Sequence, residues 1–141
     1  MKRVCLDTNV YISALVFGGK PRVVLQVVEL AGVQIVAWGE LQAEIGEVLV
    51  EKFGWSLERV EGACSLLWEG AVWVEPEALS GITRDAADHH VLGAALAAGA
   101  EWIVTGDADL LSLRAFRGIG ILTPAGFLEQ LREGFGSSGK A

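Results

Sequence analysis

The sequence is short of cysteine, and the two cysteines that it has exclude several kinds of site. Cys5 and Cys64 are the only cysteines among 141 residues. They form neither a CxxC motif nor a Cys/His spacing that would bind zinc. We therefore expect two free thiols that behave as small buried hydrophobic side chains.

A long apolar run is also missing, although 52% of the residues are hydrophobic. The most apolar stretch, residues 23–38, is interrupted by Gln26, Glu29 and Gln34 and divided by Gly32. A membrane-spanning helix needs about 20 apolar residues in succession. The sequence therefore predicts no transmembrane segment.

Neither a secretory leader nor a second domain is predicted. The apolar run at residues 4–6 ends at Asp7 and is too short for the core of a signal peptide, so we expect a cytoplasmic protein. The length suits a single domain, which we place at residues 1–133. The glycine and serine content of residues 134–141 predicts a flexible C-terminal tail.

Basic residues are scarce as well. Eleven lysines and arginines face eighteen acidic residues, which gives a formal net charge of −7. This balance excludes a basic protein that coats nucleic acid. It leaves room for an acidic pocket that gathers cations, and the cations could in turn meet phosphate.

Short runs rich in β-branched residues alternate with longer helical patterns. The alternation predicts a three-layer α/β/α fold with a central, mainly parallel five-stranded sheet. The expected strands are residues 3–6, 33–37, 71–74, 102–105 and 119–122. The expected helices are residues 10–16, 21–31, 40–53, 57–69, 85–98, 108–113 and 124–132.

Acidic residues directly follow two of the expected strands. Asp7 comes after the first strand, and Asp107 and Asp109 come after the fourth. Proteins with parallel α/β sheets bind ligands at this edge, and carboxylates grouped there repel one another unless a cation lies among them. The alternative for Asp7, Asp85 and Asp107 is a helix N-cap, a role that aspartate fills well.

The expected helix at residues 40–53 carries four glutamates, which can be ranked by their angular distance from the apolar face of the helix. At about 100° per residue, Glu44 lies closest to the buried face, followed by Glu51, Glu40 and Glu47. We therefore expect Glu44 to lean into a cleft while the other three face water. The alternative is an acidic face that is solvated throughout.

The next candidate acids are Asp85 and Asp88, which share one face at the start of a helix. We expect Asp85 to cap the helix and Asp88 to reach the site, and the sequence leaves open which of the two is a ligand. His89 and His90 point about 100° apart and have no further ligand at zinc spacing. A surface or supporting role is expected for both.

These residues belong to segments that occur in a recognisable order. The segments are Val4-Cys5-Leu6-Asp7-Thr8-Asn9, Glu44 in its helix, Arg84-Asp85-Ala86-Ala87-Asp88, and Val104-Thr105-Gly106-Asp107-Ala108-Asp109-Leu110-Leu111. Together they resemble the PIN domain (PilT N-terminal) family over residues 2–130, above all the toxins of toxin–antitoxin pairs. The chain departs from the family pattern at Gly39, often serine there, and at residues 85–89, which carry one acid fewer.

The resemblance implies a divalent-metal-dependent ribonuclease, with single-stranded RNA as the preferred substrate and an antitoxin protein as partner. The implied catalytic acids are Asp7, Glu44, Asp88 and Asp107. The implied metal ligands are the same four residues together with Asp109. The implied supporting residues, which orient the acids or bound water, are Thr8, Asn9 and Thr105.

Ligands that offer only oxygen favour Mg²⁺ or Mn²⁺ over zinc. Such an ion activates water and neutralises the charge that builds up on phosphoryl oxygens. We expect Lys20, Arg22 and Arg84 at the rim of the pocket, where they would bind phosphate. Ordinary solvated charges are the alternative for these three residues.

Two other functions stay open. A phosphotransfer domain with Asp7 as nucleophile usually has an Asp-x-Asp-x-Thr pattern, whereas position 9 here is Asn. The other is a catalytically weak PIN-like scaffold or interaction module.

The five tryptophans support association with another protein chain. Trp55 and Trp68 are candidates for a self-association or antitoxin-binding surface, with core packing as the alternative for Trp68. We expect a homodimer or a higher homo-oligomer.

Overall fold

A computed structural model describes residues 1–139, with side chains through residue 133. Its strands form one sheet in the order β3-β2-β1-β4-β6-β5. The strands are β1 (Arg3–Leu6), β2 (Gln34–Ala37), β3 (Val72–Trp73), β4 (Trp102–Val104), β5 (Ala115–Phe116) and β6 (Ile119–Leu122). Every pairing is parallel except that of β5 with β6, which is antiparallel. The mainly parallel sheet is confirmed, whereas the predicted count of five strands is wrong because β5 adds a sixth.

The additional strand β5 belongs to a tight hairpin with β6. Arg117 and Gly118, the two residues between the strands, have φ angles of 49° and 83°. Left-handed backbone of this kind is unusual for arginine. A strand of two residues is also too short to show an alternating pattern, so the sequence carried no signal for it.

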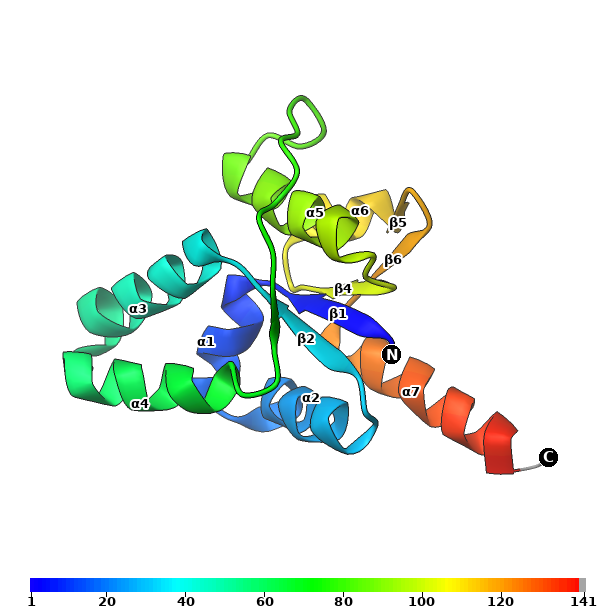
Figure 1. The fold of residues 1–141 in the computed structure, drawn as a ribbon, viewed down its shortest axis with the longest axis horizontal. Coiled ribbons are helices and arrows are strands. Elements are labelled where there is room, and N and C mark those ends of the chain that lie inside the picture. The colour runs from blue at the N-terminus through cyan, green and yellow to red at the C-terminus, as the bar shows by residue number, and fades with distance from the viewer. Residues whose placement is uncertain (140–141) are drawn as a thin grey trace.

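Helices cover both faces of the sheet (Figure 1). They are α1 (Thr8–Val16), α2 (Gly19–Leu30), α3 (Gly39–Phe53), α4 (Leu57–Leu67), α5 (Ala86–Ala98), α6 (Ala108–Leu113) and α7 (Pro124–Gly139). In the ribbon, α1, α2 and α7 lie on one side of the sheet and α5 and α6 on the other, while α3 and α4 form a hairpin beside α1. The predicted three-layer α/β/α architecture is confirmed.

Six of the seven described helices begin and end within two residues of the expected bounds; helix α2, for example, begins at Gly19 and not at Pro21. Helix α7 begins at Pro124 as expected but continues to Gly139. The expected flexible tail therefore falls on the end of α7 and on residues 140–141, which lie outside the described part of the chain. Its flexibility stays a prediction. Within the residues that the structure describes, no helix combines the length and apolar character needed to cross a membrane.

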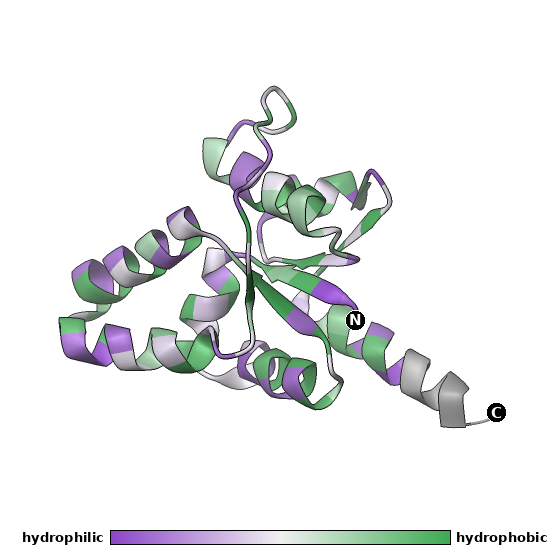
Figure 2. Ribbon diagram, in the orientation of Figure 1, coloured by the Kyte–Doolittle hydropathy of each residue, from purple (hydrophilic) through white to green (hydrophobic). Residues whose placement is uncertain are grey.

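The core lies between the sheet and the two helix layers, with apolar strands at its centre (Figure 2). Cys5 and Cys64 are free and buried, as expected. Trp68 is half-buried, and its ring lies 5.3 Å from that of Tyr11 and 5.7 Å from that of Trp73. Trp68 thus packs against neighbouring aromatic rings within the chain, in agreement with the core-packing alternative.

Candidate metal centre

Asp7 and Asp107 are brought together because β1 and β4 are neighbours in the sheet. The backbone N–H of Asp7, just after β1, donates to the Val104 carbonyl at the end of β4 at 2.9 Å. Both aspartates cap the helices that follow: Asp7 Oδ1 accepts from Thr8 N at 2.8 Å, and Asp107 Oδ2 accepts from Leu110 N at 3.0 Å. Each carboxylate therefore serves as an N-cap and also stands at the edge of the sheet.

Two polar side chains tie these strand ends together. The hydroxyl of buried Thr105 donates to Asp7 Oδ2 at 2.8 Å and accepts from the backbone N–H of Asp107 at 2.9 Å. Asn9 Nδ2 donates to Asp7 Oδ2 at 3.3 Å, and its Oδ1 accepts from Gly106 N at 3.3 Å. The carboxylate of Asp7 is thus held from three sides. Of the three predicted supporting residues, Thr8 contributes its backbone N–H.

Asp88 is the buried acid of the group. It lies in the first turn of α5 with 5% of its surface exposed, while Asp85 caps that helix by accepting from Ala87 N at 3.0 Å. Asp88 Oδ2 accepts a hydrogen bond of 2.9 Å from the hydroxyl of Thr83. The expected division, with Asp85 as cap and Asp88 directed inward, is what the structure shows.

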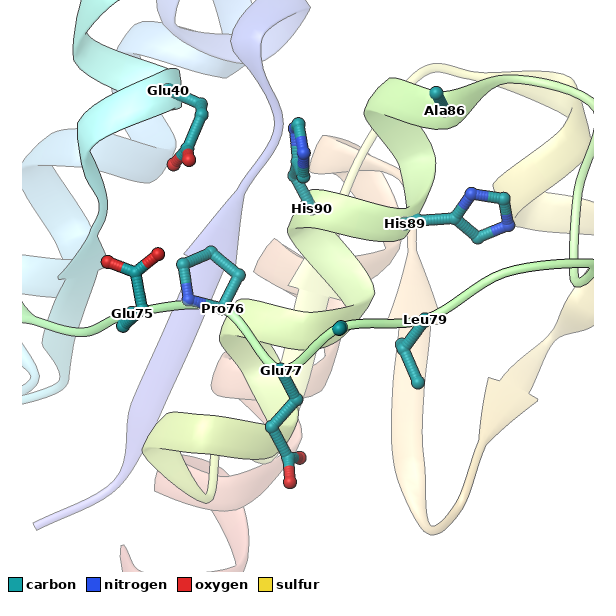
Figure 3. Close-up of a pocket in the computed structure, with 9 residues that line it drawn as sticks. Glu40, Glu75, Pro76, Glu77, Leu79, Ala86, His89 and His90 are labelled. Atoms are coloured by element: carbon teal, nitrogen blue, oxygen red, sulfur yellow. The ribbon is translucent and has the colours of Figure 1, made fainter.

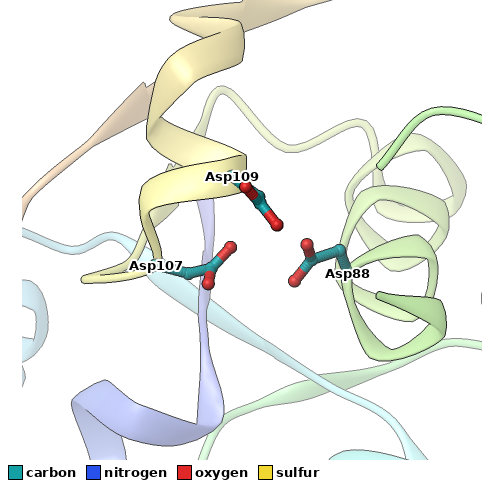
Figure 4. A group of neighbouring side chains, drawn as sticks. All are labelled: Asp88, Asp107 and Asp109. Atoms are coloured by element: carbon teal, nitrogen blue, oxygen red, sulfur yellow. The ribbon is translucent and has the colours of Figure 1, made fainter. Parts of the chain in front are cut away.

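Asp88, Asp107 and Asp109 converge, and one carboxylate oxygen from each lies within 4.8 Å of the others (Figure 4). Asp88 and Asp107 also line a cavity of about 370 Å³ whose other acidic lining residues are Asp7, Glu44 and Asp85. Glu44 enters this cavity from α3, but Glu47 and Glu51 do not line it. The ranking of the glutamates by helix angle thus selected the one that lines the acidic cavity.

The environment of two of these acids, Asp7 and Asp88, opposes their negative charge. Burial raises the pKa of Asp7, and the charges of Glu44 and Asp107 add to the increase, while hydrogen bonds from Thr105 and Thr8 partly offset it. Burial likewise raises the pKa of Asp88 to about 6, against the opposing hydrogen bond from Thr83. A cation among these carboxylates would relieve their repulsion. All the donors are oxygens, the set that suits Mg²⁺ or Mn²⁺.

The three predicted rim residues have different surroundings. Arg84 stands beside the cluster, with its Nη2 atom 3.0 Å from Asp109 Oδ1. Neither Lys20 nor Arg22 lines the acidic cavity. The Nε atom of Arg22 instead donates to the carbonyl of Ala14 in α1 at 3.2 Å.

Two polar residues of this region escaped the sequence analysis. Lys52 lines the cavity eight residues after Glu44, and this spacing on a helix is a signal that could have found it. Thr83 holds Asp88 from an irregular loop. No local pattern marks Thr83, because its contact depends on the tertiary fold.

A second cavity of about 310 Å³ opens between the start of α3, the segment after β3 and α5 (Figure 3). Its polar lining residues are Glu40, Glu75, Glu77, His89 and His90. His89 Nε2 accepts hydrogen bonds from the backbone N–H groups of Ile82 and Thr83 at 3.2 and 3.4 Å. His89 therefore supports the loop that carries Thr83, in line with the expected supporting role.

The fold and the group of aspartates at the edge of the sheet can now be compared with known protein families. A family model described as PIN domain matches residues 3–109, and the chain belongs to this family. No curated protein matches the sequence at a significant level.

A solved structure shares the fold. The chain is similar to a chain in the crystal structure of VapBC2 from Rickettsia felis bound to a DNA fragment from their promoter. The TM-score is 0.60 at 13% sequence identity, and the match covers 84% of this chain and 96% of the other. At this identity the likeness concerns the fold.

Proposed function

We propose that the protein is a divalent-metal-dependent ribonuclease that hydrolyses phosphodiester bonds in single-stranded RNA. The observation that carries the proposal is the convergence of Asp88, Asp107 and Asp109 within 4.8 Å. Membership of the PIN domain family supports it independently of this geometry.

Each residue of the site is assigned a role from its position in the cavity or at its rim. Asp88, Asp107 and Asp109 would hold Mg²⁺ or Mn²⁺, which when bound supplies an activated water and offsets charge on the phosphoryl oxygens. Asp7, fixed by Thr105 and Asn9, presents a further carboxylate to the same cavity. Glu44 lines that cavity from α3, where it would orient the attacking water. Arg84 would bind a phosphate at the rim, next to Asp109.

Cleavage of a labelled single-stranded RNA under a Mg²⁺ titration tests the proposal. Asp7→Asn removes one charge of the site, and we expect the rate to fall by more than about a hundredfold, since a metal ion contributes several kcal/mol to such a reaction. Asparagine is also a good N-cap, so the fold is expected to survive.

The matched control is Glu51→Gln, which also removes one acidic charge but at an exposed residue of α3 outside the cavity. It should cleave like the wild type. Full activity of Asp7→Asn, or cleavage that does not depend on a divalent ion, would overturn the proposal.

We further propose that the protein is the toxin of a toxin–antitoxin pair and is silenced by an antitoxin protein. The fold that it shares with a chain of the VapBC2 structure supports this assignment. Co-purification with the product of an adjacent small gene, together with loss of RNA cleavage in the complex, would be the expected result. Homo-oligomerisation and a cytoplasmic location stay predictions.

A further inference from the structure

The acidic cavity continues away from the aspartates along the groove between α1 and α3. On α3, its lining residues Glu44, Val48 and Lys52 are spaced four apart and therefore form a row along one face. This row extends about 12 Å along the helix, at about 1.5 Å per residue. Ile12 and Ser13 of α1 line the same cavity. The groove thus leads from the acids toward the C-terminal ends of both helices.

Two phenylalanines stand at that far end. Phe53 lines the cavity, and its ring centroid lies 5.9 Å from that of Phe17, the C-cap of α1, with the two planes at 80°. Phe17 is 74% exposed and Phe53 is 37% exposed. Neither ring is needed to fill the core, so the pair offers aromatic surface to a ligand.

Lys52 provides positive charge between the acids and the aromatic pair. It is the one basic residue among the described residues that line this cavity. It is exposed and forms no salt bridge within the described part of the chain. In a protein with a net charge of −7, a lysine at this place is suited to meet a phosphate.

We propose that Phe17, Phe53 and Lys52 form a subsite for single-stranded RNA, in which Lys52 contacts a backbone phosphate and a base further along the strand from the scissile phosphate stacks on the aromatic pair. The proposal rests on the proposed ribonuclease function. Aromatic side chains bind bases of any sequence through their faces, and only unpaired bases are free to stack in this way. Because the groove is continuous with the acids and carries Lys52, these observations favour RNA over a protein as its occupant.

The test compares two labelled ligands by fluorescence anisotropy, a short oligouridylate and an abasic ribose-phosphate oligomer of the same length. Ca²⁺ replaces Mg²⁺ to slow cleavage, and a gel confirms that the ligand stays intact. We expect Phe17→Ala and Phe53→Ala to weaken oligouridylate binding roughly tenfold each, the usual effect of losing one stacking ring. Binding of the abasic oligomer should not change.

Further variants separate stacking from other effects. Phe17→Trp keeps an aromatic face and should restore binding of oligouridylate, whereas Phe17→Leu should not. Lys52→Gln should weaken both ligands and lower the slope of log affinity against log salt by about 0.7, the contribution of one phosphate contact to a single strand. Leu66→Ala, at a 74% exposed leucine of α4, is the apolar control and should bind like the wild type.

Two results would overturn the subsite. One is equal binding of oligouridylate by the phenylalanine variants and by Leu66→Ala. The other is a changed oligomeric state of the phenylalanine variants, measured by light scattering, with RNA binding intact, which would identify the pair as a protein-docking surface. If either result is found and the wild-type protein still cleaves RNA, only the subsite is wrong and the proposed ribonuclease function stands. If the wild-type protein does not cleave RNA, the ribonuclease function is contradicted.

Discussion

Two cavities with acidic walls lie on either side of the start of α5, and they differ in how their acids are held. In the first cavity the acids are mostly aspartates fixed by helix caps and by the hydroxyls of Thr83 and Thr105. In the second, Glu40, Glu75 and Glu77 are exposed, and within the described chain none of their carboxylates accepts a hydrogen bond. Asp88 and Asp107 of the first cavity converge with Asp109, with ligand atoms within 4.8 Å of one another, whereas among the described residues no such group includes an acid of the second cavity. Acidic composition alone therefore does not bring carboxylates together. In the first cavity, helix caps and hydroxyl groups hold short acidic side chains in place.

The largest difference between the two cavities is expected in the binding of divalent ions. Asp88→Asn should abolish Mg²⁺ binding measured by calorimetry and reduce RNA cleavage by more than about a hundredfold, because it removes a buried ligand charge. Glu40→Gln removes the same charge from the other cavity and should change neither quantity. Equal losses in both variants would mean that net charge, rather than the held cluster, attracts the ion.

A smaller effect is expected when the support of the acids is removed and the acids are kept. Thr105→Val is nearly isosteric, but it deprives Asp7 of a hydrogen-bond donor and the Asp107 N–H of its acceptor. Loss of such outer contacts usually lowers metal affinity or activity about 10- to 100-fold. The readouts are the Mg²⁺ dissociation constant and the initial cleavage rate.

Thr123→Val is the matched control for this substitution. The Thr123 hydroxyl accepts from Gly126 N at the start of α7, and Thr123 does not line the acidic cavity. This variant should lose some thermal stability but no ion binding. If Thr105→Val binds Mg²⁺ as the wild type does, the hydrogen bonds around Asp7 are not what organises the site.

The smallest effect concerns stability without metal. The ordinary pKa of Asp88 is 3.8, the value expected in the unfolded chain, and in the folded protein it is raised to about 6. The folded state therefore holds the proton more tightly, so the carboxylate destabilises the fold above about pH 6, and this cost disappears as the pH falls toward 3.8. In EDTA at neutral pH, Asp88→Asn should raise the Tm by a few degrees.

The same variant should gain little below about pH 3.8, where the carboxyl group is largely protonated in both states. Glu75→Gln, in the other cavity, should leave the Tm close to that of the wild type at either pH. An Asp88→Asn protein that is less stable than the wild type in EDTA at neutral pH would show that the carboxylate supports the fold.

The positions of several acids in the first cavity could be predicted from the sequence, because they depend on residues close together in the chain. Strand ends followed by aspartate predicted the positions of Asp7 and Asp107, and the angular ranking of glutamates singled out Glu44, which lines the acidic cavity. The parallel sheet likewise followed from the alternation of strands and helices.

The remainder depends on contacts between distant segments. Thr83 lies in a loop with no pattern of its own, and β5 is two residues long. Arg22 resembled a phosphate-binding residue, but its Nε atom bonds a helix carbonyl that only the fold brings near.

The order of the strands also has a consequence for the protein during its synthesis. Asp7 and Glu44 leave the ribosome early, but β4 and the loop with Asp107 come about a hundred residues after Asp7, and β6, which supports β4, comes later still. A nascent chain therefore carries Asp7 and Glu44 of the acidic cavity, but none of the converging aspartates, until translation has passed Asp88. Any chemistry of the completed cavity is therefore confined to chains that the ribosome has nearly finished.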